Sequence, residues 1–120
     1  MTWPGTLLVA LGGALGSVLR YGVGAYATLA FGTGFPWGTL AVNIIGSACI
    51  GLAGGLGIGG DLRLLLVTGV LGGFTTFSAF SLETGLLFQR NPWLAALYVG
   101  ASLGLGLAAF ALCFWLGRRL

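Results

Sequence analysis

Four long apolar stretches divide this chain, and short clusters of glycine, proline and polar residues separate them. The stretches cover about residues 4–29, 37–57, 62–88 and 93–116. Each one is long enough for a helix to cross the bilayer, which takes roughly 20 apolar residues. None alternates with the period of two that marks a membrane-spanning strand. We therefore predict an all-α membrane protein, a single domain over residues 1–120 with four transmembrane helices.

The composition leaves no room for a water-soluble domain. Hydrophobic residues make up 58% of the chain and charged residues only 6%, against about 25% charged in a typical soluble domain. The five basic residues are arginines that form no stripe along which a phosphate backbone could run, so we expect no nucleic-acid partner. We expect a multi-pass protein in contact with membrane lipid, its first stretch retained as a helix rather than cleaved as a signal.

The residues that usually build metal centres and active sites are scarce. The chain has no histidine, and its two cysteines, Cys49 and Cys113, lie inside apolar stretches. A zinc site and a disulfide framework are therefore not expected. No nucleophile stands with a matching base, so the chain is not expected to be an enzyme.

The arginines give only a weak signal for orientation in the membrane. Arg63, Arg118 and Arg119 fall on one side of the predicted bundle, and Arg20 and Arg90 belong to the other. Three against two is almost no positive-inside bias. A chain that inserts in both orientations can form an antiparallel, dual-topology homodimer, and a parallel dimer with a weak topology signal is the alternative.

The third stretch carries its own interruption. Gly72 and Gly73 are followed closely by Thr75 and Thr76, and glycine and β-branched residues both make a poor helix centre. We predict that this helix is broken near its centre, which frees backbone carbonyls inside the membrane. Carbonyl oxygens that meet near a two-fold axis would suit a small hard cation such as sodium.

Polar side chains recur at helical spacing in the second and fourth stretches. Three of them stand four residues apart in the second stretch: Thr39, Asn43 and Ser47. The amide of Asn43 either joins two helices by hydrogen bonds or faces a passing hydrogen-bonding species. Tyr98 and Ser102 repeat the spacing in the fourth stretch, where Gly106 continues the row.

Charged and aromatic side chains inside the stretches need an explanation. Arg20 could bind carbonyls at a helix end, pair with Glu83 or Asp61, or reach lipid headgroups. Glu83 is the one acid within a stretch, where a functional role is the default. Phe77 and Phe80 share a helix face, usually a sign of core packing. Their hydroxyl-rich surroundings favour the alternative that the electropositive ring edges meet an anion.

Glycines at four-residue spacing mark two further helix faces. Gly12, Gly16 and Gly24 share a face in the first stretch, and Gly100 and Gly104 share one in the fourth. Small residues at this spacing allow two helix backbones to approach closely. We expect these glycines to serve helix packing.

Three segments together resemble the small bacterial fluoride channels of the Fluc (CrcB) family. They are GGALGSVLRY at 12–21, GTLAVNIIG at 38–46 and GGFTTFSAFSLE at 72–83, in the order of the family. The fourth stretch resembles the family mainly through Tyr98 and Ser102. The resemblance implies a dual-topology antiparallel homodimer in the bacterial inner membrane, with two parallel pores that let fluoride leave the cytoplasm passively.

The resemblance also implies which residues line each pore. Phe77 and Phe80 would be the pair of pore-lining rings, and Asn43 would donate a hydrogen bond to fluoride. Tyr98 and Ser102 would belong to a polar track along the fourth helix.

Further roles follow from the same resemblance. The carbonyls of Gly72 and Thr75 from both subunits would hold a central structural sodium ion. Glu83 and Arg20 would be additional conduction-related positions. By their chemistry the threonines, Thr39 among them, can also donate hydrogen bonds to a strongly hydrated anion.

Two positions depart from the family pattern. Ala79 stands where a threonine is common, and Gly106 stands where a second hydroxyl of the track is expected. The polar track in this chain is therefore expected to be shorter or filled by water.

Two other functions fit a chain of this size. A small proton-coupled multidrug-type exporter would share the span count and the dual topology, but it needs an acid in the first span, and no acid precedes Asp61. A structural accessory subunit is disfavoured by the polar Asn43, the broken third helix and Glu83.

Overall fold

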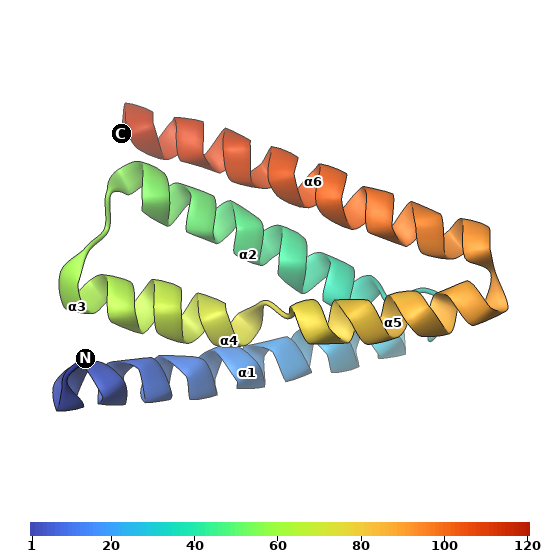
Figure 1. Ribbon diagram of the computed structural model, residues 1–120, viewed down its shortest axis with the longest axis horizontal. Coiled ribbons are helices and arrows are strands. Elements are labelled where there is room, and N and C mark those ends of the chain that lie inside the picture. The colour runs from blue at the N-terminus through green and yellow to red at the C-terminus, as the bar shows by residue number, and fades with distance from the viewer.

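The computed structural model describes residues 1–120 and is entirely helical. Four helices are long and apolar enough to cross a membrane (Figure 1): α1 (Trp3–Phe31), α2 (Trp37–Leu56), a broken helix over Gly60–Arg90 and α6 (Pro92–Arg119). The prediction of four spans with a bend near the middle of the third is confirmed. Three of the four spans run on past the apolar stretches. At the ends of the broken span and of α6 the additional residues include Arg90, Arg118 and Arg119, whose side chains can extend to the membrane surface.

The broken third span consists of four consecutive helical pieces. They are α3 (Gly60–Arg63), the π-helical segment η1 (Leu64–Leu71), α4 (Gly72–Phe74) and α5 (Phe77–Arg90). Only the two residues between α4 and α5 leave the helical conformation. The π-helical segment was not foreseen from the sequence.

Local side-chain chemistry sets the ends of the long helices. The Thr2 hydroxyl accepts a hydrogen bond of 3.1 Å from the Gly5 amide at the start of α1. Asn91 does the same for α6, where its Oδ1 accepts from the Trp93 amide at 3.1 Å. Gly57 ends α2 in the left-handed conformation (φ 72°), which glycine adopts without steric cost. These residues fix where α1 and α6 begin and where α2 ends.

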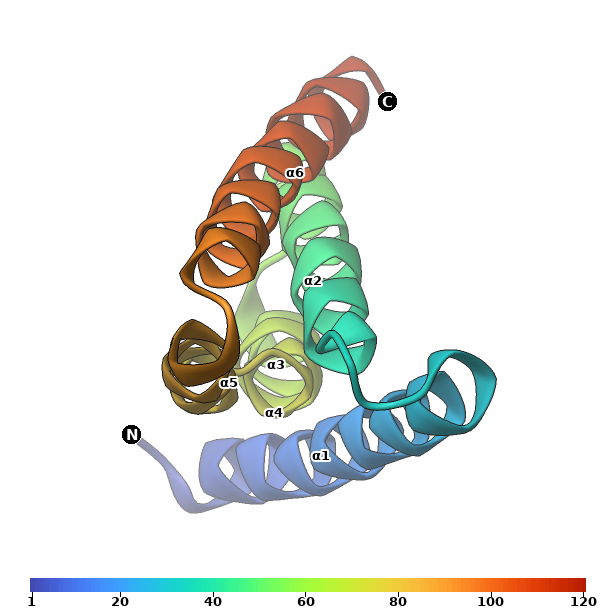
Figure 2. The same cartoon turned by 90° about the vertical axis from the view of Figure 1, so that its right-hand side faces the viewer.

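The helices surround the broken span on two sides. Both chain termini and α3 lie at one end of the bundle in Figure 1. In the end-on view of Figure 2, α1 lies on one side of the broken helix, and the pair α2–α6 lies on the other. Helix α1 packs on η1, α4 and α2, whereas α6 packs on α2 and α5. The break is therefore held between α1 and the packed pair α2–α6.

Glycines bring α1 and η1 into backbone contact. A Cβ atom added at Gly12 would overlap the carbonyl oxygen of Leu65, and one added at Gly16 would overlap that of Val70. The expectation that these two glycines serve helix packing is confirmed.

A second glycine contact joins α2 to α6. A Cβ atom at Gly51 would overlap the carbonyl oxygen of Phe110, and one at Gly55 would overlap that of Phe114. Gly100 and Gly104, in contrast, have no atom within 4 Å of their Cβ positions. The expected packing role of these two is wrong within one protomer, because α6 approaches α2 through another face.

The buried core is small, as expected for a protein whose exterior faces lipid. Only 16 of the 120 residues are buried. A cluster of four of them, Leu40, Leu87, Ala95 and Tyr98, joins α2, α5 and α6. This cluster fixes the second half of the broken helix against α2 and α6.

We predict that Gly16→Ala lowers the thermal unfolding midpoint of the purified protein in detergent. The added methyl group meets the Val70 carbonyl, and such overpacking costs about 1–3 kcal/mol. Gly22→Ala is the matched control, because nothing lies within 4 Å of that position on the same helix. Equal midpoints for the two variants would contradict the packing role of Gly16.

Candidate functional site

The third span is interrupted at Thr75 and Thr76, which are both extended (φ −81°, ψ 156° and φ −151°, ψ 121°). The Thr76 side chain starts the next helix, because its Oγ1 accepts a hydrogen bond of 3.1 Å from the Ala79 amide. Threonine is a good residue for this capping position and a poor one inside a helix. The same residue type thus explains both the end of α4 and the start of α5.

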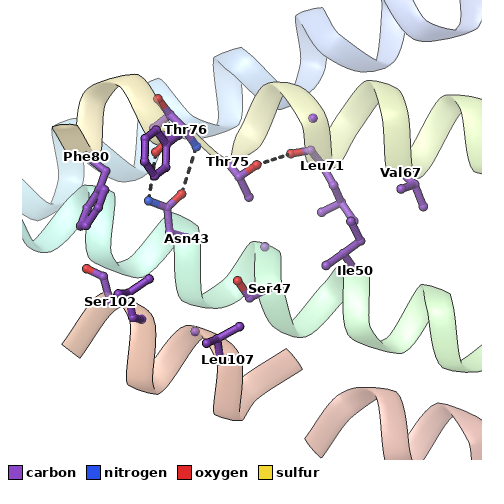
Figure 3. Close-up of a pocket in the computed structure, with 15 residues that line it drawn as sticks. Asn43, Ser47, Ile50, Val67, Leu71, Thr75, Thr76, Phe80, Ser102 and Leu107 are labelled. Atoms are coloured by element: carbon purple, nitrogen blue, oxygen red, sulfur yellow. Dashed lines mark hydrogen bonds between the residues drawn. The ribbon is translucent and has the colours of Figure 1, made fainter. Parts of the chain in front are cut away.

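Asn43 on α2 binds the backbone at this break through two hydrogen bonds (Figure 3). Its Nδ2 donates to the Thr76 carbonyl at 3.1 Å, and its Oδ1 accepts from the Thr76 amide at 3.0 Å. Of the two roles left open for Asn43, the joining of two helices is therefore observed. One N–H of the side-chain amide is not used in these bonds.

Arg20 on α1 binds a second peptide group of the break. Its Nε donates to the Gly73 carbonyl at 3.2 Å. A continuous helix would satisfy this carbonyl with the amide of Phe77. Among the three partners considered for Arg20, the carbonyl at a helix end is the one found.

Two further carbonyls lose their helical partners at the break. In a continuous helix the Thr76 amide would bind the Gly72 carbonyl, and the Ala79 amide would bind the Thr75 carbonyl. Here the Thr76 amide donates to Asn43 and the Ala79 amide donates to the Thr76 hydroxyl. The carbonyls of Gly72 and Thr75 are thus deprived of their usual donors.

A groove of about 370 Å³ runs beside the break, and we call it the central groove. It is formed by α2, the broken helix and α6, and no charged residue lines it. The predicted site residues in its lining are Asn43, Gly72, Thr75, Phe77, Phe80 and Ser102. The Ser102 hydroxyl oxygen is buried and has no hydrogen-bond partner. The central groove therefore offers neutral hydrogen-bond donors and aromatic rings to a small ligand.

The two predicted phenylalanines differ in their surroundings. Phe80 packs against the core, with ring centroids 5.7 Å from Phe77 and 5.1 Å from Tyr98. Phe77 is 78% exposed, and Tyr98 is fully buried. The rings thus form a row that leads from the open side of the central groove into the core.

Three more of the predicted residues lie in a second cavity, which we call the side groove. It has a volume of about 850 Å³ and lies between α1, α2 and α5, with Arg20, Thr39 and Glu83 in its lining. The Tyr98 hydroxyl donates to Glu83 Oε2 at 3.1 Å. Thr76 lines both grooves. Apart from the buried Tyr98, which lines neither cavity, the predicted set is divided between two cavities that meet at the break.

Two residues that belong to the site were not selected from the sequence. Thr76 holds Asn43, caps α5 and lies in both grooves. The sequence did indicate the capping role of Thr76, since a threonine just before the start of a helix is typical of an N-cap. Ser47 lines the central groove, and its signal was its place in the polar stripe with Asn43.

Comparisons with known proteins agree on one family. The family described as "CrcB-like protein, Camphor Resistance (CrcB)" matches residues 7–117. A protein of Rhizobium etli named "Fluoride-specific ion channel FluC" is 56% identical over 108 residues, which cover 85% of this chain and 86% of that protein. Proteins of the same name from Allorhizobium ampelinum and Thermus thermophilus are 52% and 53% identical, and each alignment covers 95% of this chain and 96% and 94% of the respective relative.

We predict that Asn43→Leu lowers the thermal unfolding midpoint in detergent. The substitution leaves the amide and the carbonyl of Thr76 without their partner, which costs on the order of 2–4 kcal/mol. Cys49→Leu is the control, because Cys49 is exposed on the same helix. An unchanged midpoint for Asn43→Leu would show that the break does not depend on this pair of hydrogen bonds.

Proposed function

Because the chain belongs to the CrcB family, we propose that it is a fluoride-selective channel that lets the ion leave the cytoplasm passively. The chain is a multi-pass protein of the bacterial inner membrane and not an enzyme. One structural observation carries the proposal. The broken third span places Phe77, Phe80, Asn43 and Ser102 around one uncharged groove.

The chemistry of the central groove suits a small, strongly hydrated anion. Such an ion leaves water only if other donors replace its hydration shell. The free N–H of Asn43 and the unpartnered hydroxyl of Ser102 supply hydrogen bonds. The edges of the Phe77 and Phe80 rings add weaker attraction. With no cationic side chain in the lining, binding stays weak enough for the ion to move on.

We assign the side groove to an entrance region of the same pathway. Arg20 and Glu83 lie in its lining with Thr39, and Thr76 connects it to the central groove. The guanidinium of Arg20 would raise the local concentration of anions there, while its Nε stays on the Gly73 carbonyl. Glu83 would orient the Tyr98 hydroxyl that donates to it.

We propose that two copies of the chain assemble as an antiparallel, dual-topology homodimer. The central groove is open on the protomer, and Phe77 on its lining is 78% exposed. No atom of a neighbouring helix lies within 4 Å of the Cβ positions of Gly100 and Gly104, so a helix of a second chain could pack closely against this face of α6. Arg63, Arg118 and Arg119 lie at one end of the bundle, and Arg90 lies at the other, with Arg20 at the break. This small difference gives only a weak positive-inside bias.

We further propose that the carbonyls of Gly72 and Thr75 hold a structural sodium ion. These carbonyls have lost their helical donors, and both residues line the central groove. Carbonyl oxygens are the kind of ligand that a hard cation prefers. A bound ion would neutralise the carbonyl dipoles at the break.

The alternative of a proton-coupled multidrug-type exporter is not favoured. The relatives are named as fluoride-specific ion channels and not as exporters. The first span has no acid, and the Glu83 carboxylate in the third accepts a hydrogen bond from Tyr98.

We predict that purified protein in liposomes releases fluoride to a fluoride electrode, and that it releases neither chloride nor a lipophilic cation at a comparable rate. Phe80→Ile should slow fluoride release at least about tenfold. The substitution removes the middle ring of the row formed by Phe77, Phe80 and Tyr98, and it keeps an apolar side chain.

Phe88→Ile is the matched control for this experiment. Phe88 lies on the same helix, is 60% exposed and does not line either groove. Fluoride release by this variant should equal that of the parent chain. Absence of fluoride release from the parent protein would overturn the proposed function, and normal release by Phe80→Ile would overturn only the role of that ring.

We also predict that a single cysteine added after Leu120 is labelled from both sides of the membrane. The experiment uses a background with Cys49→Ala and Cys113→Ala, since both native cysteines are free. A membrane-impermeant maleimide should modify about half of the molecules in intact cells and all of them after lysis. Labelling of all molecules, or of none, in intact cells would eliminate dual topology.

A further inference from the structure

The row of polar side chains on α6 ends at Gly106, which has no side chain. Tyr98, Ser102 and Gly106 stand four residues apart on one helix face, and only the first two carry a hydroxyl. Ser102 and Gly106 both line the central groove. A guest that moves along α6 would therefore meet a donor at Ser102 and a bare backbone one turn later.

A hydroxyl from α2 lies at the place of the missing side chain. A Cβ atom built on Gly106 would be 3.5 Å from the Oγ of Ser47. Ser47 also lines the central groove, and Figure 3 shows it on the side of α2 that faces α6, one turn beyond Asn43. The absence of a side chain at 106 thus leaves the Ser47 hydroxyl open to the groove.

The Ser47 hydroxyl is free to bind a guest. Hydroxyls inside the helices of this chain commonly donate to the carbonyl four residues earlier, as those of Thr28, Ser81 and Thr84 do. No side-chain hydrogen bond within the chain involves Ser47, and the hydroxyl of Ser102 is likewise unpartnered. The central groove therefore contains two hydroxyls without a partner, one on each of the two helices that pack together.

We propose that Ser47 supplies the hydroxyl that α6 lacks at Gly106, so that the path for the anion crosses from Ser102 on α6 to Ser47 on α2. This inference rests on the proposed function and adds a donor to it. A small anion would pass from Ser102 to Ser47 while the second N–H of Asn43 lies one turn away on the same face of α2. Because a side chain at position 106 would lie against the Ser47 hydroxyl, this role of Ser47 depends on the glycine at 106.

The test moves the hydroxyl between the two helices and measures fluoride release from liposomes. Ser47→Ala should slow release about tenfold, since a hydrogen bond to a charged group is lost. Ser47→Ala combined with Gly106→Ser should restore release to within about threefold of the parent rate, because the new side chain is placed in ordinary contact distance of position 47. Cys49→Ala, exposed on the same helix, should release fluoride like the parent.

Two results would overturn the inference. One is release by Ser47→Ala at the parent rate, which would make Ser47 a packing residue only. The other is a double variant that unfolds at the parent temperature and still conducts like Ser47→Ala. If the double variant unfolds at a lower temperature, Ser47→Thr decides: retained release supports the inference, and a loss equal to that of Ser47→Ala overturns it. A parent protein that releases no fluoride would instead refute the proposed function.

Discussion

The structure depends on one constraint, which is that a peptide chain broken inside a membrane must still satisfy its backbone groups. The amide and carbonyl of Thr76 are paired by the Asn43 side chain, and the Gly73 carbonyl is paired by Arg20. These two polar side chains come from different helices, one on each side of the broken span. The break is therefore a built feature of the fold, stable only because α1 and α2 each contribute a partner.

Close helix packing is what brings those partners within reach. Gly12 and Gly16 allow α1 to touch the backbone of η1, and Gly51 allows α2 to touch that of α6. A side chain at Gly12 or Gly16 would push α1 away from η1. The hydrogen bond from Arg20 to the Gly73 carbonyl, at 3.2 Å, would then be lost. The glycines thus keep the helices close to the break, and the polar residues form hydrogen bonds with its backbone groups.

The sequence predicts the spans and the break well, because both follow from local properties. Apolar length determines the four helices, and Gly72 with Thr76 weakens the third at its centre. The partner of Arg20 was not predictable, since carbonyl, carboxylate and headgroup were all compatible with its position. The division of the site into two grooves also could not be predicted. It depends on how helices far apart in the sequence pack together. Tyr98 on α6 is buried by that packing, with its ring against Phe80 and its hydroxyl on Glu83.

The distribution of charge follows from the same arrangement. The guanidinium of Arg20 is anchored at the break from the side of α1, so its charge lies in the side groove, and the central groove is lined only by neutral groups. An anion can then be attracted toward the break without meeting a full positive charge that would hold it. Neutral donors bind such an ion less strongly, so several of them in sequence are required. That requirement agrees with the place of the free hydroxyls, Ser47 on α2 and Ser102 on α6, along one groove.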